Sequence, residues 1–405
     1  MESLRIDGAR VVLRNEVLET SLFIEAGLIQ EIGTQTKADR SIDARGRLLA
    51  PGLIDIHGDA FERVIMPREG VFFPLDIAIL ETDRQLAANG ITTAYHAVTL
   101  SWEPGLRHIE SSENFIHRIT TLSPRLCVEN RIQLRWETFA FEALDLIKST
   151  LQGPLLPSVA FNDHTSTTMR SFDMSLQNRP FEHSDVFEEA SLDDPRLLGR
   201  IEAKLKRSGL SQDEFLKHLG QVWDRRPEVP QKIQEVATLA RGCDAPMLSH
   251  DDSQIETRDY YRVLGAQTSE FPMNTETVRY AKENADLIVL GAPNVLRGGS
   301  HLGSGSPNAS EMIAEGLCHI LASDYYYPAM LGALHRLYQQ DTAPLAQLWS
   351  LVSHGPAQAM KLWDRGVIEV GKRADLVLVD WSKDQSPAVH MTMSNGVMTS
   401  QFTPF

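Results

Sequence analysis

Imidazole and carboxylate side chains recur at the ends of short apolar segments along this chain. They are His57 and Asp59 in GLIDIHGD, Glu137 in RIQLRWE, Asp163 and His164 in VAFNDH, His250, Asp251 and Asp252 in APMLSHDD, and Asp324 in HILASD. Neutral imidazole nitrogen and carboxylate oxygen are the ligands that Zn²⁺ and similar divalent ions take in proteins. The recurrence predicts a site for one or two divalent metal ions, with Zn, Mn and Fe as candidates.

Two of the carboxylates have further roles in such a site. A carboxylate such as Glu137 can bridge two metal ions. A water molecule bound to a divalent ion has its pKa lowered towards about 7 and becomes a nucleophile. A free carboxylate beside that water can take and return its proton, and Asp324 is the candidate for this catalytic role.

Most of the 13 histidines are expected to lie elsewhere. Five stand in helix-like or loop-like contexts and are interpreted as surface or ordinary core residues: His108, His117, His183, His218 and His335. His96 ends an apolar segment, and whether it faces the site stays open. The metal prediction therefore depends on the joint occurrence of His57, His164 and His250 rather than on any one of them.

A glycine-rich segment, GAPNVLRGGSHLGSGS (291–306), has the composition of an anion-binding loop. Arg297 can make bidentate contacts to a phosphate, and Gly298 and Gly299 would let backbone N–H groups approach an anion. Ser300 and His301 add donors. The alternative is a flexible Gly-Ser loop without a ligand, and the residue types alone do not decide between the two.

A second cationic element, Glu62-Arg63 with Arg68, follows the first apolar segment. Arg63 is a further candidate for substrate binding. A surface ion pair explains the same residues equally well.

The elements that must position these residues alternate between strand-like and helix-like patterns from Leu53 to about Arg365. The eight strand-like segments are GLIDIH, ITTAYHAV, RIQLRWE, LPSVAFNDH, APMLSHDD, AQTSEFP, ADLIVLGAP and CHILASDY. Such alternation favours an α/β fold with a parallel sheet, and eight strands favour a (β/α)8 TIM-like barrel. The carboxyl ends of barrel strands meet at one face, which would bring the candidate ligands together.

The two chain ends have a different pattern. Residues 2–48 and the stretch from 366 onwards read as short strands and turns, which predicts one small β-sandwich domain made from both ends. We expect residues 1–50 and 366–405 in this domain, and residues 51–365 in the barrel. The stretch 165–242 is too long for one crossover, and its charged, helix-prone sequence predicts a helical insertion near the mouth.

The composition limits the partners. Asp plus Glu number 54 and Lys plus Arg 39, giving a net charge of −15, which argues against nucleic acid or an anionic membrane as partner. No apolar run is long enough for a signal sequence or a membrane span. Three cysteines, Cys127, Cys243 and Cys318, form no pairing motif. We expect a cytoplasmic protein, and a homodimer stays open.

Two terminal motifs, APGLIDIHGD and RGVIEVGKRADLVLVD, together with the split β domain, resemble the amidohydrolase superfamily over the whole chain. NGITTAYHAV, LSHDDSQ, EFPMNTE, LGAPNVLRGGSHLG and LASDYYYPAM further resemble its diphosphatase branch in the carbon–phosphorus lyase pathway of phosphonate utilisation. That resemblance implies hydrolysis of the 5-triphosphate of α-D-ribose 1-methylphosphonate with release of pyrophosphate. It implies a small anionic phosphorylated substrate, whose triphosphate the Arg297 loop would bind.

The resemblance also implies a ligand set. His57, Asp59, Glu137, His164 and His250 would hold one or two metal ions, and Asp324 would be a ligand or the base. The superfamily's usual first motif is His-X-His, whereas this chain has His57-Gly58-Asp59. An oxygen ligand thus replaces a nitrogen ligand, which permits Mn²⁺ or Fe²⁺ beside Zn²⁺.

Two other functions remain open at this point. The same barrel and a similar ligand set serve enzymes that cleave C–N bonds, such as sugar-phosphate deacetylases and cyclic amidases. Some members of the superfamily have lost their metals and act as scaffolds, which the retained His, Glu and Asp set argues against.

Overall fold

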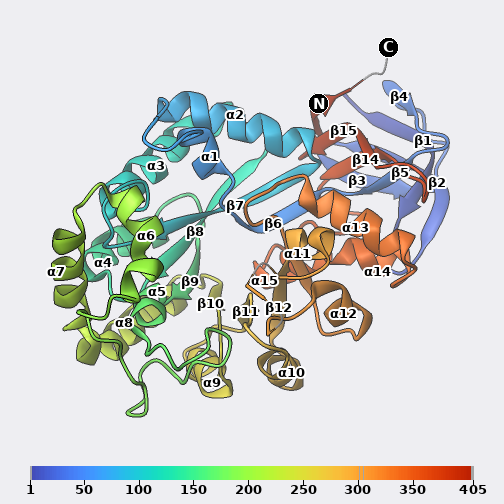
Figure 1. Ribbon diagram of the computed structural model, residues 1–405. Helices are drawn as coiled ribbons and strands as arrows, with labels where there is room; N and C mark the ends of the chain where they lie inside the picture. Colours follow the sequence, from blue (N-terminus) through green and yellow to red (C-terminus); the bar gives the residue numbers. More distant parts are fainter. Residues whose placement is uncertain (1, 301, 304, 403–405) are drawn as a thin grey trace.

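The core of the molecule is a barrel of eight parallel strands, as a computed structural model describes it for residues 2–300, 302–303 and 305–402. The strands are β6 (Leu53–Gly58), β7 (Ile91–Leu100), β8 (Glu129–Glu137), β9 (Ser158–Asn162), β10 (Met247–His250), β11 (Thr268–Glu270), β12 (Leu287–Gly291) and β13 (Ile320–Ala322). They pair in sequence order. Each overlaps one of the eight segments predicted as strands, and β6, β7 and β8 extend beyond theirs by one or two residues. The predicted barrel is confirmed (Figure 1).

Burial on both faces explains the apolar character of these strands. All ten residues of β7 are buried, as expected for a parallel sheet with its own interior on one face and helices on the other. In β8 the side chains alternate, and the inward positions include Gln133, Arg135 and Glu137. Polar residues therefore reach the interior of the barrel from a strand whose other face packs in the core.

The barrel closes between its first and last strands. The Asp324 amide donates to the His57 carbonyl at 3.0 Å, and the Asp59 amide donates to the Asp324 carbonyl at 2.9 Å. Below them, the buried Asp55 carboxylate accepts from the Ser323 amide at 3.0 Å and from its hydroxyl at 2.5 Å. A Cβ at Gly58 would lie 2.6 Å from Asp55 Oδ2, so the glycine between the two candidate ligands leaves room for this contact.

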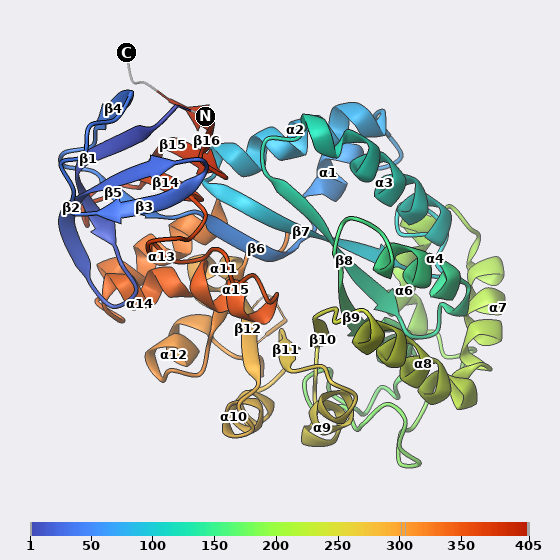
Figure 2. The same ribbon diagram turned by 180° about the vertical axis from the view of Figure 1, so that it is seen from behind.

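Helices surround the barrel. They are α1 (Phe61–Ile65), α2 (Leu75–Ala88), α3 (Ile109–Leu122), α4 (Leu144–Leu151), α9 (Ile255–Val263), α10 (Thr275–Glu283), α11 (Ala292–Arg297), α12 (Ala309–Ala314), α13 (Ala329–Gln339), α14 (Leu345–Ser350) and α15 (His354–Ala359). Seen from behind, α2, α3 and α4 cover the outside of β7 and β8 (Figure 2). Among the described residues, no helix is long and apolar enough to cross a membrane.

The region expected to carry extra helices contains four of them. They are α5 (His164–Met169), α6 (Leu197–Ser208), α7 (Gln212–Trp223) and α8 (Val229–Gly242). α8 packs on α4 as an ordinary barrel helix, while α6 lies against α5 at the carboxyl end of β9. Residues 170–196 between α5 and α6 form no helix, a feature that the charged sequence did not indicate.

The two chain ends form a separate sheet beside the barrel (Figure 1). Its strands are β1 (Leu4–Val12), β2 (Val17–Glu25), β3 (Leu28–Ile32), β4 (Arg40–Asp43), β5 (Leu48–Pro51), β14 (Leu376–Asp380), β15 (Ala388–Ser394) and β16 (Val397–Gln401). β14 from the C-terminal end pairs with β5 from the N-terminal end, and both ends supply residues to one apolar core. The sheet from both ends is therefore as expected, while the exact division at residues 50 and 366 stays a prediction.

Candidate metal centre and active site

Side chains at the ends of five barrel strands, β6, β9, β10, β11 and β13, converge at the mouth in three groups of ligand-capable atoms. The groups are His57, Asp59 and Asp324; His164, His250 and Asp251; and His57, His250 and Glu270. Within each group the atoms lie within 4.8 Å of one another. Five of the six predicted metal ligands are in these groups, and the sixth, Glu137, is not.

Glu270 at the end of β11 is a central residue that the sequence analysis did not select. Its carboxylate lies 2.8 Å from His250 Nδ1 and 3.1 Å from His57 Nδ1, and it accepts from Gln133 Nε2 at 2.8 Å. Burial opposes its ionisation, but the neighbouring His57 and His250 outweigh burial and hold its pKa well below the usual range. With both Nδ1 atoms engaged in this way, the Nε2 atoms of the two imidazoles are directed to the mouth.

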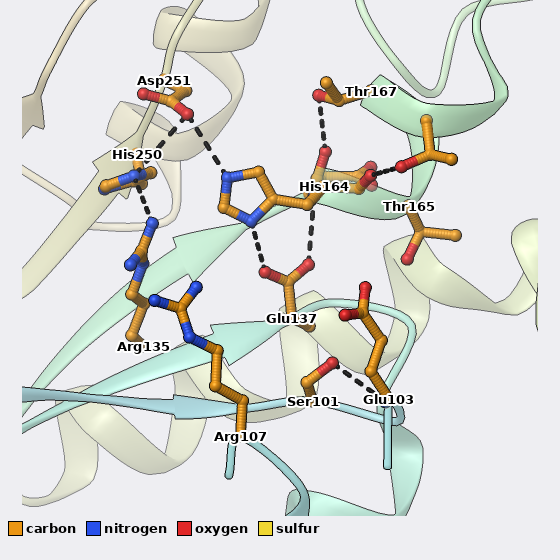
Figure 3. Close-up of polar contacts among 12 residues, drawn as sticks. Ser101, Glu103, Arg107, Arg135, Glu137, His164, Thr165, Thr167, His250 and Asp251 are labelled. Carbon is orange, nitrogen blue, oxygen red and sulfur yellow. Dashed lines mark hydrogen bonds and ion pairs between the residues drawn. The ribbon is translucent and has the colours of Figure 1, made fainter. Parts of the chain in front are cut away.

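Glu137 belongs to none of the three groups but contacts His164, a member of one of them (Figure 3). Its Oε1 lies 2.6 Å from His164 Nδ1, and its Oε2 accepts from the His164 amide at 3.0 Å. Burial opposes its ionisation, but His164 outweighs burial and lowers the pKa of Glu137 to about 2. This geometry suits a residue that orients the imidazole. Its role as a metal ligand or bridge stays a prediction.

Two other residues with metal-capable side chains have structural partners instead. Asp163 caps α5, accepting from the Ser166 amide and hydroxyl at 2.7 Å each. The buried Asp252 accepts from the hydroxyls of Ser249 at 2.6 Å and Ser269 at 2.9 Å.

His96, whose orientation the sequence left open, faces the surrounding helices. It lies 2.7 Å from Asn130 Oδ1 and edge-on to Phe61 and Phe115, away from the mouth.

Two arginines complete the inner wall of the site. Arg135 of β8 donates to His250 Nε2 at 3.0 Å and lies 3.7 Å from Asp59. Arg107, between β7 and α3, lies 3.6 Å from Asp59 and forms a bidentate pair with Glu62. Figure 3 shows both guanidinium groups directed to the space between His250 and Glu137. The alternation of β8 places Arg135 on the same face as Glu137, and this signal was present in the sequence.

Three residues at the mouth have an unusual backbone. Asp251, Phe271 and Asp324 follow β10, β11 and β13, and their φ angles are 61°, 54° and 55°. Residues other than glycine rarely adopt this left-handed region, which costs of order 1 kcal/mol or more and is common at functional sites. The Phe271 ring packs edge-on to His57 and His250 and lines the cavity beside them.

The charge balance of this cluster fits divalent cations. Five carboxylates converge here, those of Asp59, Glu137, Asp251, Glu270 and Asp324, against the two guanidinium groups of Arg107 and Arg135. Burial and the neighbouring Asp59 raise the pKa of Asp324 to about 6. An excess of buried negative charge is costly unless a cation compensates it, and imidazole with carboxylate is a suitable donor set for such an ion.

The candidate ligands open into a cavity of about 350 Å³ whose far wall is the segment after β12. Arg297, Gly299 and Ser300 line it, whereas Gly298 does not. The amides of Gly298 and Gly299 donate to the Asn294 carbonyl at 3.1 and 2.9 Å. These amides therefore end α11 and are not available to an anion, contrary to the expectation for the loop. His301 lies outside the described residues.

Arg297 and Arg63 differ in how they relate to the cavity. Arg297 is exposed at the end of α11, and among the described residues it has no hydrogen-bond or ion-pair partner. Arg63 is exposed, and its guanidinium donates to the carbonyl of Tyr325, which lines the cavity. Arg297 is thus the cationic side chain of this wall, and the Ser300 hydroxyl lines the cavity beside it, whereas Arg63 does not line the cavity.

Comparison with known proteins agrees with this barrel and site. Residues 236–399 match the model of the amidohydrolase family. The chain belongs to the amidohydrolase family and is a hydrolase of that superfamily. It is 32% identical over 379 residues to the α-D-ribose 1-methylphosphonate 5-triphosphate diphosphatase of Escherichia coli K12, with 92% of this chain and 94% of the relative covered. The resemblance inferred from the motifs is confirmed.

Solved structures with the same fold are far more distant in sequence. An adenosine deaminase from Xanthomonas campestris with bound Zn is 14% identical with a TM-score of 0.61, covering 98% of this chain and 92% of that one. The L-hydantoinase of Arthrobacter aurescens is 15% identical with a TM-score of 0.54, covering 99% and 96%. At these identities the likeness supports the barrel and its accompanying sheet alone.

Proposed function

We propose that this protein hydrolyses α-D-ribose 1-methylphosphonate 5-triphosphate, or a close analogue, and releases pyrophosphate in phosphonate catabolism. The observation that carries the proposal is the convergence of candidate metal ligands and arginines, Arg107, Arg135 and Arg297, on one cavity in an acidic chain. The similarity to the E. coli diphosphatase over nearly the whole chain supports the same substrate class.

Two of the ligand groups suit one metal ion each, and they are held by different strands. His57, Asp59 and Asp324 would form one, and His164, His250 and Asp251 the other. Divalent ions bound there would supply an activated water molecule and neutralise the charge of a phosphate group. We place the α-phosphorus of the substrate beside these groups.

The chain's own residues have three tasks in this reaction. Asp324 takes the proton of the attacking water and returns one to the leaving oxygen, which departs with the β- and γ-phosphates as pyrophosphate. Arg107 and Arg135 face the oxygens of the phosphate under attack, where a charge-assisted contact is strong. Phe271 covers the imidazoles and limits the access of other water molecules.

A substrate panel tests the proposed reaction. The ribose methylphosphonate triphosphate, a nucleoside triphosphate and an N-acetyl sugar phosphate would be offered to the protein, with phosphate and pyrophosphate detected separately. We expect pyrophosphate from the first in a 1:1 ratio with the ribose product and no amine from the last. Release of acetate without any pyrophosphate would contradict the proposal and favour the C–N hydrolase.

A second prediction concerns Arg297. The Arg297→Ala change should raise KM for the ribose methylphosphonate triphosphate by roughly 10- to 150-fold, the scale of losing a charge-assisted phosphate or phosphonate contact. Metal content should not change, because Arg297 is not among the candidate ligands. The exposed Arg279, which pairs with Glu315 outside the cavity, provides the control variant Arg279→Ala. An unchanged KM in Arg297→Ala would remove this wall from substrate binding.

A further inference from the structure

A second cavity, of about 310 Å³, adjoins the candidate metal centre on the side of the helical region. It shares His164 and Arg107 with the first cavity. Its walls come from the ends of β7 and β8, from α5 and from α6, and its lining residues are Thr99, Ser101, Glu103, Arg107, Glu137, His164, Thr167, Thr168, Arg170, Leu176, Arg200, Lys204 and Arg207. We call it the insertion chamber. Figure 3 shows its inner edge around Ser101, Glu103, Arg107 and Glu137.

The insertion chamber is cationic, although the protein as a whole carries −15. Its lining has five cationic side chains, from Arg107, Arg170, Arg200, Lys204 and Arg207, against two carboxylates, from Glu103 and Glu137, which leaves an excess of three positive charges. Leu176 is the only apolar side chain among its described lining residues. A cleft with one sign of charge concentrates ligands of the opposite sign, so this lining favours a compact polyanion.

Two of these cations have no carboxylate partner among the described residues. Arg200 donates to the carbonyls of Thr168 at 3.0 Å and Ser171 at 3.1 Å, and Arg170 donates to the Thr167 carbonyl. Arg170 Nε is buried without a hydrogen-bond partner among the described residues. Burial and the nearby Arg200 lower the pKa of Arg170 to about 10, as expected where positive charges face one another without compensation.

Glu103 holds two further cations at the wall of the chamber. It pairs with Lys204 and, at 3.5 Å, with Arg207. Lys204 is 15% exposed and Arg207 is 40% exposed, so these side chains of α6 remain accessible from the cavity. The single Glu103 carboxylate fixes the positions of both cations but can neutralise the charge of only one of them.

A buried hydroxyl adds an unused donor. Thr99 is 4% exposed, lines the insertion chamber, and its Oγ1 has no hydrogen-bond partner among the described residues. The Ser101 hydroxyl accepts from the Glu103 amide at 3.1 Å and keeps its own proton to donate. A ligand with several acceptor oxygens would satisfy both hydroxyls, which a monovalent cation or an apolar group would not.

We propose that the insertion chamber binds the pyrophosphate end of the substrate, the β- and γ-phosphates, through Arg170, Arg200, Lys204 and Arg207. This assignment rests on the proposed function, because it places the scissile bond where His164 and Arg107 separate the two cavities. The methylphosphonate end then lies in the first cavity near Arg297, which the sequence analysis had assigned to the triphosphate. Each anionic end of the substrate meets its own cations, and the metal centre stands between them.

The experiment measures the binding of inorganic pyrophosphate by isothermal titration calorimetry, with the purified protein in its metal-containing form. Metal content is determined before and after each titration, because free pyrophosphate binds metal ions. We expect Arg207→Gln and Arg170→Gln each to raise the Kd by about 10-fold, since each removes a charge-assisted contact to phosphate. Lys206→Gln is the matched control, because Lys206 lies on the same helix but pairs with Glu202 outside the chamber. Arg297→Ala should leave the Kd for pyrophosphate unchanged.

Two outcomes would overturn the assignment: no pyrophosphate binding by the native protein, or a Kd that is the same in Arg207→Gln as in Lys206→Gln. Arg207 is partly exposed, so its variant tests the chamber even if Arg170→Gln does not fold. The assignment and the proposed function fail separately. Chamber-dependent pyrophosphate binding without hydrolysis of the ribose triphosphate would retain the chamber and reject the reaction. Pyrophosphate release with unchanged pyrophosphate binding in both chamber variants would retain the reaction and reject the chamber.

Discussion

Chelation of bound metal should abolish hydrolysis by this protein, and addition of Mn²⁺ or Zn²⁺ should restore it. The expected loss is about 1000-fold or more, because a divalent ion lowers the pKa of water from 15.7 to about 7 and stabilises phosphate charge by several kcal/mol. No side chain among the candidate groups replaces that effect. The imidazoles and carboxylates there are ligands for a cation and cannot supply the two positive charges of the metal ion.

The measurement is the rate of pyrophosphate release against metal content per chain, before chelation, after it and after each metal is returned. His250→Ala should lower the metal content, since His250 belongs to two of the ligand groups. His117→Ala, on the outer helix α3, is the control and should retain it. Full activity in protein shown to be free of metal would reject the mechanism.

Asp324→Asn should reduce kcat by about 100-fold or more, the usual scale for the loss of a general base. The amide cannot take a proton from the attacking water, while its size is that of the carboxyl group. Asparagine also tolerates the left-handed backbone of this position, where φ is 55°. The backbone bonds of residue 324 to β6 should therefore persist, and KM should change little.

The measurement is kcat and KM with metal content determined on the same sample. Asp341→Asn, an exposed residue paired with Lys383, is the control. If metal content also falls in Asp324→Asn, the residue is a ligand as well as the base. A variant with near-normal kcat would remove Asp324 from the mechanism.

The sequence indicated the eight barrel strands because their apolar runs are buried on both faces, and such runs are visible without a structure. It indicated that His57, His164, His250 and Asp324 would meet, because strand ends share one face of a barrel. It did not indicate which oxygen contacts which nitrogen. Glu270 lies in the sixth predicted strand, AQTSEFP, yet its contact with two imidazoles depends on the curvature of the closed barrel.

The cations of the site were harder to find for a physical reason. Arg200, Lys204 and Arg207 lie on a helix that an irregular segment separates from the barrel, and nothing in their spacing distinguishes them from a solvated helix face. The glycines after Arg297 suggested free amides, but a helix that ends in Gly-Gly consumes those amides in its own cap. The long-range placement of the α6 cations and the capping of α11 by its own glycines could not be predicted from the residue types alone.

The closure of the barrel by Asp55 and Ser323 has a consequence for how the protein is made. These residues are 268 positions apart, and the ligand group formed by His57, Asp59 and Asp324 straddles the same seam. A growing chain cannot complete that group until almost all of the barrel has left the ribosome. Metal uptake between the first and last strands therefore follows folding. An ion bound there would stabilise the closed barrel relative to any form opened between β6 and β13.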